Sequence, residues 1–154
     1  MHPRKSNSQR QVRIVLIIDD NPTDVLLMKE AFALSGIDSE IHSAEDGVRV
    51  LELLGKKNSS DQLPRPDIIL LDLNMPKKNG LEVLVELKSD PKFSTIPIIV
   101  YTSSVVPDDV KSAYRRHANA YVKKPGDFES YIKIAKSISD FWLSSAIFCD
   151  NDFQ

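Results

Sequence analysis

Four polar side chains stand at the ends of three short aliphatic runs, where they could do chemistry together. They are Asp19, Asp20, Asp72 and Thr102. Neighbouring carboxylates repel one another, since two unit charges about 4 Å apart cost roughly 4 kcal/mol at an effective dielectric constant near 20. Such a cluster must take up protons or bind a cation. Oxygen ligands alone suit Mg²⁺, which usually takes one or two carboxylates together with phosphate oxygens.

Asp72 is the hardest of these residues to explain by structure alone. It directly follows Ile-Ile-Leu-Leu, and an acid at the end of a buried strand is costly unless its charge is compensated. A carboxylate there can act as a nucleophile that carries a phosphoryl group, and Lys124 supplies a cation near the same edge if residues 120–122 form a strand. Each of these residues also has an alternative, purely structural role. Asp72 can open a turn, the Asp19–Asp20 pair can cap a helix, and Lys124 can be a surface lysine.

The elements that must position these side chains alternate along the chain. Continuous aliphatic runs are typical of strands buried on both faces of a parallel sheet. The expected strands cover residues 14–18, 39–43, 68–71, 96–100 and 120–122. Apolar periodicity and capping residues predict helices over residues 21–34, 46–54, 81–87, 107–117 and 127–143. This order predicts an α/β fold, a doubly wound five-stranded parallel sheet with five helices, whose ligands bind beyond the carboxyl ends of the strands.

Composition bounds the class of protein. The chain has 154 residues and a net charge of −2, which fits one domain and gives no pull toward nucleic acid or anionic lipid. No apolar run approaches the roughly 18–20 residues of a membrane span, and residues 1–11 lack the apolar stretch of a secretory signal. The lone Cys149 excludes an intramolecular disulfide. A soluble, cytoplasmic domain is expected, with no nucleic-acid or membrane partner.

Several short motifs, taken in order, resemble the receiver domains of two-component response regulators. They are Asp19-Asp20, Asp72-Leu-Asn-Met-Pro76 with Gly80, Tyr101-Thr-Ser103 and Tyr121-Val-Lys-Lys-Pro125. Each motif is weak alone, but the set in this order is highly specific. The resemblance runs from residue 12 to about residue 143. It implies a flavodoxin-like sheet with strand order 2-1-3-4-5.

The resemblance also implies a role for each site residue. Asp72 would accept a phosphoryl group from a histidine kinase, and the chain would catalyse nothing beyond its own phosphorylation and dephosphorylation. Mg²⁺ would be bound directly by Asp20, Asp72 and the backbone carbonyl of Asn74, and through a water by Asp19. Lys124 would pair with the phosphoryl oxygens. No other cofactor is implied.

A switch is implied as well. The Thr102 hydroxyl would move toward the new phosphoryl group, and Tyr121 would follow into the vacated space. The alternative for Tyr121 is a plain edge-strand aromatic residue.

The expected organisation is a flexible leader at residues 1–11, a receiver domain at residues 12–148, a tail at residues 149–154 and no output domain. Residues 127–148 carry more apolar side chains than one buried helix stripe needs. The excess predicts a homodimer through the fourth helix, fifth strand and fifth helix. The alternative is a helix end that folds back over its own domain.

Finer details resemble the small receivers that serve phytochrome-type histidine kinases. They are Asp72 to Gly80, Thr102-Ser-Ser104, His117-Ala-Asn-Ala-Tyr121 and Phe141-Trp142.

Three other functions are compatible with an α/β fold of this kind, and the sequence argues against each. A pseudo-receiver would keep the fold without phosphorylation, yet all five site positions are intact. A phosphatase of the haloacid dehalogenase type requires a second acid two residues after its nucleophile, where this chain has Asn74. A flavodoxin-like ligand-binding protein would need a phosphate-binding loop after the first strand, where this chain has two acids, Asp19 and Asp20.

Overall fold

The computed structural model describes residues 12–55, 63–75 and 77–149. The expected leader (residues 1–11), Pro76 of the loop motif and all but the first residue of the expected tail lie outside the described residues.

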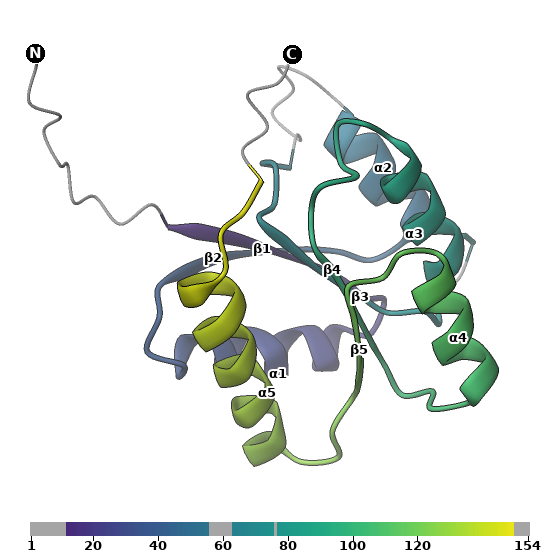
Figure 1. Ribbon diagram of the computed structural model, residues 1–154. Helices are drawn as coiled ribbons and strands as arrows, with labels where there is room; N and C mark the ends of the chain where they lie inside the picture. The colour runs from purple at the N-terminus through teal and green to yellow at the C-terminus, as the bar shows by residue number, and fades with distance from the viewer. Residues whose placement is uncertain (1–11, 56–62, 76, 150–154) are drawn as a thin grey trace, which may run out of the picture.

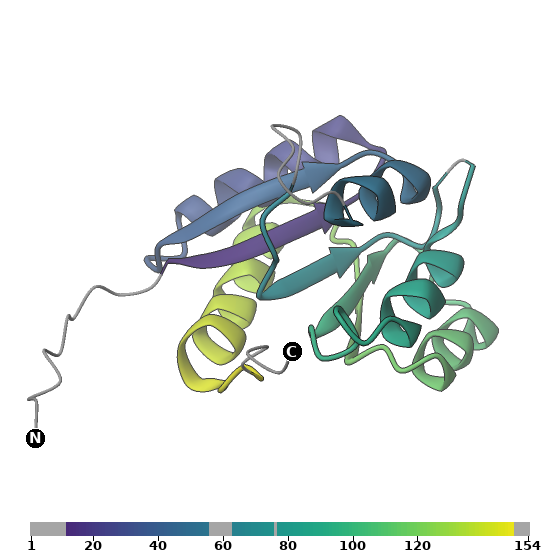
Figure 2. The same cartoon turned by 90° about the horizontal axis from the view of Figure 1, so that it is seen from above.

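Five parallel strands form one sheet in the order β2-β1-β3-β4-β5 (Figure 1). The strands are β1 (Arg13–Ile18), β2 (Ser39–Ala44), β3 (Ile68–Leu71), β4 (Ile98–Thr102) and β5 (Ala120–Lys123). Figure 2 shows them lying side by side with a progressive twist. The expected fold class and strand order are therefore confirmed, and β1 and β3 are central neighbours whose carboxyl ends lie together.

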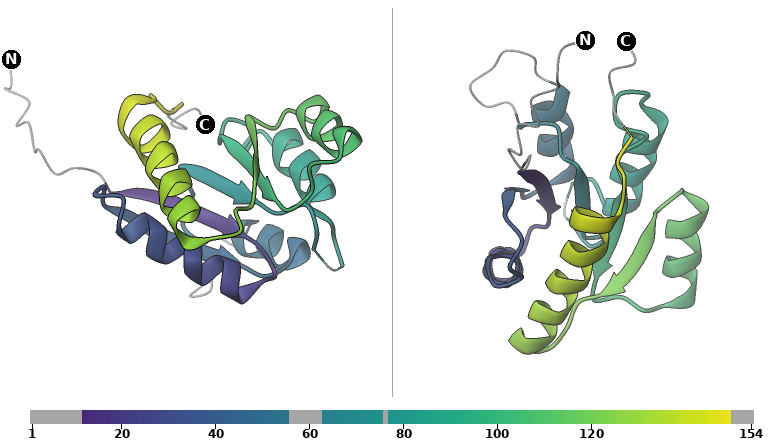
Figure 3. Two further views of the ribbon diagram at one scale, coloured as in Figure 1. Left: turned by 90° about the horizontal axis from the view of Figure 1, so that it is seen from below. Right: turned by 60° about the vertical axis from the view of Figure 1, so that its left-hand side comes forward.

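Helices cover both faces of this sheet. They are α1 (Pro22–Ala33), α2 (Gly47–Gly55), α3 (Gly80–Ser89), α4 (Pro107–Arg115) and α5 (Phe128–Asp140), followed by a π-helical turn, η1 (Phe141–Ser145). α1 and α5 pack against each other on one face (Figures 1 and 3). α2, α3 and α4 cover the other face. No helix in the described residues is long and apolar enough to cross a membrane.

Alternate residues of each central strand serve different cores, because successive side chains of a strand point to opposite faces. In β1, Val15 and Ile17 join the core under α1 and α5, whereas Leu16 and Ile18 join the core under α2 and α3. All four are essentially inaccessible to solvent. This two-sided burial explains the continuous aliphatic runs, and it makes the strand ends a rigid support for the polar residues that follow.

Several expected boundaries differ from the observed ones by one to three residues, and two of these differences have a clear structural basis. The fourth strand runs from Ile98 to Thr102 rather than over residues 96–100, since Pro97 has no N–H to donate to the sheet. Thr102 is consequently the last residue of β4 and pairs with Lys123 of β5. The last helix leaves α-helical geometry at Phe141 instead of continuing to residue 143.

Candidate functional site

Three carboxylates gather at the carboxyl ends of β1 and β3. Asp19 and Asp20 follow β1, Asp72 follows β3, and one oxygen from each lies within 4.8 Å of the others. Asp19 and Asp72 are buried and Asp20 is exposed. The buried pair is held by the backbone, because Asp19 Oδ1 accepts from the Asn21 N–H at 2.9 Å and Asp72 Oδ1 from the Asn74 N–H at 3.1 Å.

Helix capping does not explain the two acids after β1. The N-cap of α1 is Asn21, whose side-chain oxygen accepts from the N–H groups of Thr23 and Asp24 at 3.0 and 3.2 Å. Pro22 occupies the first helical position, where its missing N–H costs nothing. Asp19 and Asp20 therefore precede the helix and remain available to the cluster.

Lys124 reaches into this cluster from the residue after β5. Its Nζ lies 3.0 Å from Asp72 Oδ2 and 2.8 Å from Asp19 Oδ2, and its side chain is only 7% exposed. Neighbouring Lys123 is exposed. Lys124 is therefore not an ordinary surface lysine, and its ammonium lies among the carboxylates at the carboxyl ends of the strands.

A third carboxylate on Lys124 was missed from the sequence. Asp24, in the first turn of α1, accepts a hydrogen bond of 2.8 Å from Lys124 Nζ at Oδ2, and Oδ1 accepts from the Tyr131 hydroxyl at 3.1 Å. An acid in a first helical turn is usual because it suits the helix dipole. The available signal was its place one helical turn after Asp20, on the side of α1 nearest the strand ends.

Burial and charge set the protonation of the cluster. Burial raises the pKa of Asp19 to about 6, and this effect outweighs the attraction of Lys124. Burial on its own would lower the pKa of Lys124, but the carboxylates of Asp19 and Asp24 more than offset it, so the pKa of that ammonium is raised. Lys124 therefore stays charged while Asp19 titrates close to physiological pH.

The donor set fits a hard divalent cation. Asp19, Asp20 and Asp72 offer oxygen ligands, as Mg²⁺ requires. Asp19 Oδ2 is buried without a regular hydrogen bond, since Lys124 Nζ lies within ion-pair distance but outside hydrogen-bonding geometry. Such an oxygen is an acceptor that a cation or a cation-bound water can satisfy.

Thr102 and Asn74 complete the edge near Asp72. Thr102 is fully buried at the end of β4, and its Oγ1 lies 3.4 Å from Asn74 Nδ2. The structure thus brings Thr102 to the loop that carries Asp72, as the strand-end argument predicted.

Tyr121 has a specific partner. Its side chain is half-buried against the core under α2 and α3, and its hydroxyl donates to the backbone carbonyl of Ser104 at 2.8 Å. The Ser104 hydroxyl in turn lies 2.5 Å from Asp109 Oδ2 of α4. Tyr121 therefore ties β5 to the loop between β4 and α4, which begins directly after Thr102.

The backbone around Gly80 explains why the Asp72 motif has a glycine at this position. It is the first residue of α3, and a Cβ there would collide with the backbone of Asp72 and Leu73. Its N–H donates to the Leu73 carbonyl at 3.0 Å. Only glycine permits this close approach, so Gly80 fixes the loop that positions Asp72.

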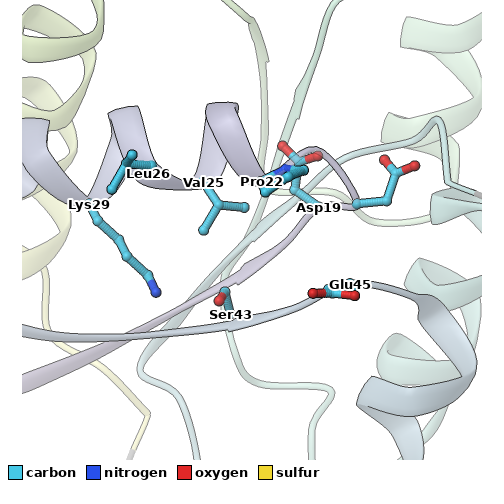
Figure 4. Close-up of a pocket in the computed structure, with 8 residues that line it drawn as sticks. Asp19, Pro22, Val25, Leu26, Lys29, Ser43 and Glu45 are labelled. Carbon is cyan, nitrogen blue, oxygen red and sulfur yellow. The ribbon is translucent and has the colours of Figure 1, made fainter.

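A shallow pocket borders the cluster on the α1 side (Figure 4). Its volume is about 290 Å³, and Asp19 and Asp20 form one end of it. Val25 and Lys29 line it from α1, and Ser43 and Glu45 line it from β2 and the residue after it. Asp20 is exposed to solvent on this side of the cluster, and Asp19 lines the pocket although it is nearly buried.

Fold and site together define a receiver domain. A family model for the response regulator receiver domain matches residues 15–136, and the chain belongs to that family. Among curated relatives, it is 36% identical to the response regulator Rcp1 of Synechocystis sp. over 140 residues, which cover 91% of this chain and 95% of Rcp1.

Two solved structures give the same grouping. The phosphorylated cyanobacterial phytochrome response regulator RcpA superposes with a TM-score of 0.83 at 37% identity, covering 90% of this chain and 99% of RcpA. The Mn²⁺-bound form of Rcp1 superposes with a TM-score of 0.81 at 36% identity, covering 90% of this chain and 99% of Rcp1. The chain is therefore a receiver-domain response regulator similar to those of phytochrome signalling.

Proposed function

We propose that this response regulator accepts a phosphoryl group from a histidine kinase onto Asp72 in a Mg²⁺-dependent reaction. The observation that carries the proposal is a buried carboxylate at the end of a central strand, contacted at 3.0 Å by a buried lysine and flanked by two further acids. A purely structural acid would not need this surrounding charge. Membership of the receiver family supports the same function.

The chain contributes positioning and charge compensation, which are the chief requirements of phosphoryl transfer. A carboxylate oxygen of Asp72 attacks phosphorus in line with the leaving imidazole nitrogen of the kinase histidine. The P–N bond breaks as the acyl phosphate forms. Lys124 neutralises charge on the phosphoryl oxygens, and the Thr102 hydroxyl donates to one of them after transfer.

Asp20, Asp72 and the backbone carbonyl of Asn74 would hold Mg²⁺, with Asp19 acting through a bound water. When bound, the ion supplies positive charge that offsets the charge of the phosphoryl oxygens. The similar protein Rcp1 has a Mn²⁺-bound form, which supports the binding of a divalent ion by this chain.

Phosphorylation would switch the surface formed by α4 and β5. A phosphoryl group adds close to two negative charges and strong acceptors next to Thr102. Movement of Thr102 toward it would pull the loop that follows, whose Ser104 carbonyl holds the Tyr121 hydroxyl. Tyr121 and α4 would then change position together.

The direct test is incubation with acetyl phosphate and Mg²⁺, followed by intact-mass measurement. Wild-type protein should gain the mass of one phosphoryl group, and Asp72→Asn should gain none. EDTA should abolish the gain. Asp38→Asn, which removes an exposed acid far from the cluster, is the matched control and should behave as wild type. Absence of a gain in wild type, together with undetectable Mg²⁺ binding, would favour the pseudo-receiver instead.

The kinase is proposed to be of the phytochrome type, since the similar structures include phytochrome response regulators. A purified phytochrome-type kinase labelled with radioactive ATP should transfer its label to this chain faster than an unrelated histidine kinase does. Equal transfer from both would contradict the partnership.

Signal output is proposed to pass through association of the domain itself, as a homodimer formed by α4, β5 and α5. Apolar side chains are exposed just before and within α4 and just after α5. They are Val105, Val106, Tyr114 and Phe141, each between 49% and 57% exposed. Sedimentation should detect dimers at tens of micromolar. Monomer alone, with and without phosphorylation, would exclude this assembly.

A further inference from the structure

The Lys124 ammonium contacts one carboxylate that lies outside the acid cluster. Asp24 Oδ2 is 2.8 Å from Nζ, whereas the proposed phosphoacceptor Asp72 is 3.0 Å away. Of the acids around Lys124, Asp19 and Asp72 belong to the group that could share a metal ion, and Asp24 does not. Asp24 therefore binds the lysine at least as closely as the phosphoacceptor does, without belonging to the proposed metal site.

Asp24 is itself held in place. Its second oxygen accepts a hydrogen bond from the Tyr131 hydroxyl at 3.1 Å. Tyr131 is 3% exposed, and its ring meets the ring of Tyr101 edge-on with centroids 6.3 Å apart. The Lys124 ammonium lies 5.7 Å from the centre of that same Tyr101 ring. Tyr131 thus holds the carboxylate, while Tyr101 packs against Tyr131 and borders the ammonium.

The two kinds of carboxylate differ in the demands on them. Asp19 and Asp72 would have to serve Lys124 and a divalent ion at once, and Asp72 would also have to form a bond to phosphorus. Asp24 has only Lys124 and Tyr131 as side-chain partners among the described residues. It can keep its contact with the lysine while the other two acids change theirs.

We infer that Asp24 is a positioning residue for phosphoryl transfer, which holds the Lys124 ammonium beside Asp72 and is held in turn by Tyr131. This inference rests on the proposed phosphorylation of Asp72. Asp24 touches no reacting atom and acts through Lys124 alone. A charge-assisted hydrogen bond of this kind restricts a flexible four-carbon side chain to the geometry that the reaction uses.

The first test compares phosphorylation rates with acetyl phosphate and Mg²⁺. Asp24→Asn keeps the shape and the Tyr131 contact but removes the charge, and it should slow the reaction about tenfold through loss of positioning. Asp24→Glu restores the charge and should stay within about threefold of wild type. The matched control Glu30→Gln removes an exposed acid from the same helix and should change nothing. A wild-type rate in Asp24→Asn, or equal slowing in the Asn and Glu variants, would overturn the inference.

A second readout needs no phosphoryl group. The ¹⁵N-detected NMR signal of the Lys124 ammonium should be visible in wild type, because hydrogen bonding slows its exchange with water. It should be lost in Asp24→Asn and broadened in Tyr131→Phe, and its retention in Asp24→Asn would count against the inference. Failure of wild type to take up a phosphoryl group would overturn the proposed function. Normal uptake by wild type and Asp24→Asn alike would overturn only the role of Asp24.

Discussion

Two lysines, one near the amino ends of the strands and one near their carboxyl ends, each lie among three oxygen acceptors. Lys88 of α3 sits near the edge where the strands begin, and its Nζ donates to the carbonyls of Ser94 and Ile96 at 3.4 and 3.0 Å and to Asn119 Oδ1 at 2.9 Å. Lys124 sits at the edge where the strands end, and its three partners are all carboxylates.

The charge of the acceptors separates the two lysines. Burial lowers the pKa of Lys88, whose acceptors in the described structure are neutral. At Lys124 burial acts in the same direction, yet its carboxylates reverse the outcome and raise the pKa. At Lys88 the neutral acceptors tie loops together, whereas the carboxylates at Lys124 hold a cation that, under the proposed function, also pairs with the phosphoryl group. Similar coordination thus gives one lysine a lowered pKa and the other a raised one, and only the second lies at the proposed phosphorylation site.

The largest expected effect follows from removing the charge of Lys124, which tests the contrast between the two lysines. Lys124→Met should slow phosphorylation of Asp72 by about 10²-fold, because one charge that stabilises the phosphoryl oxygens is lost. Lys88→Met is the matched variant, and its phosphorylation rate per folded molecule should equal that of wild type. The phosphorylation rates of both variants are measured by intact mass over time, and circular dichroism checks that each variant is folded. Equal slowing in both variants would mean that the two lysines do not differ in role.

A smaller effect concerns stability. Since the pKa of Asp19 is raised to about 6 from 3.8, its ionised form costs stability above that pH, and this cost is absent at pH values below 3.8. Without divalent cations, Asp19→Asn should therefore raise the free energy of unfolding by about 2 kcal/mol near neutral pH. The gain should fade as the pH drops through about 6 toward 4. Urea unfolding across this range measures it, with Asp38→Asn as control, and a pH-independent gain would contradict the assignment.

The smallest effect tests the structural edge. Asn119 Oδ1 accepts from both Lys88 Nζ and the Ile98 N–H, each at 2.9 Å. Asn119→Ala should lower the free energy of unfolding by about 1 kcal/mol, since Asn119 is exposed and water can replace part of the bonding. Phosphorylation should be unchanged. A loss of phosphorylation in this folded variant would show that the two edges are coupled.

Local signals predicted much of the fold. The run Ile68–Leu71 was predicted as a strand with its observed bounds, because an uninterrupted aliphatic segment suits only a fully buried strand here. The start of α1 followed from Asn21 and Pro22. The π-helical turn at Phe141–Ser145 was not predictable, because apolar spacing alone does not distinguish it from α-helix.

The part of the site that the sequence predicted is the part where strand ends converge. Asp19, Asp72 and Lys124 each follow a strand, so parallel topology brings them together. Asp24 lies inside a helix, and its contact with Lys124 depends on the packing of α1 beside the end of β5. Tyr131 lies on the buried face of α5, and no sequence pattern predicts that its hydroxyl donates to a carboxylate.

The separation between Lys124 and its acids has a consequence for synthesis. Lys124 and Asp24 are 100 positions apart, and a ribosome makes the N-terminal part of a chain first. A nascent chain therefore carries Asp19, Asp24 and Asp72 well before it carries their counter-ion. A chain released before Lys124 would keep Asp72 but lack the lysine that contacts it at 3.0 Å. Under the proposed function, the charge balance of the site is complete only once residue 124 has been synthesised.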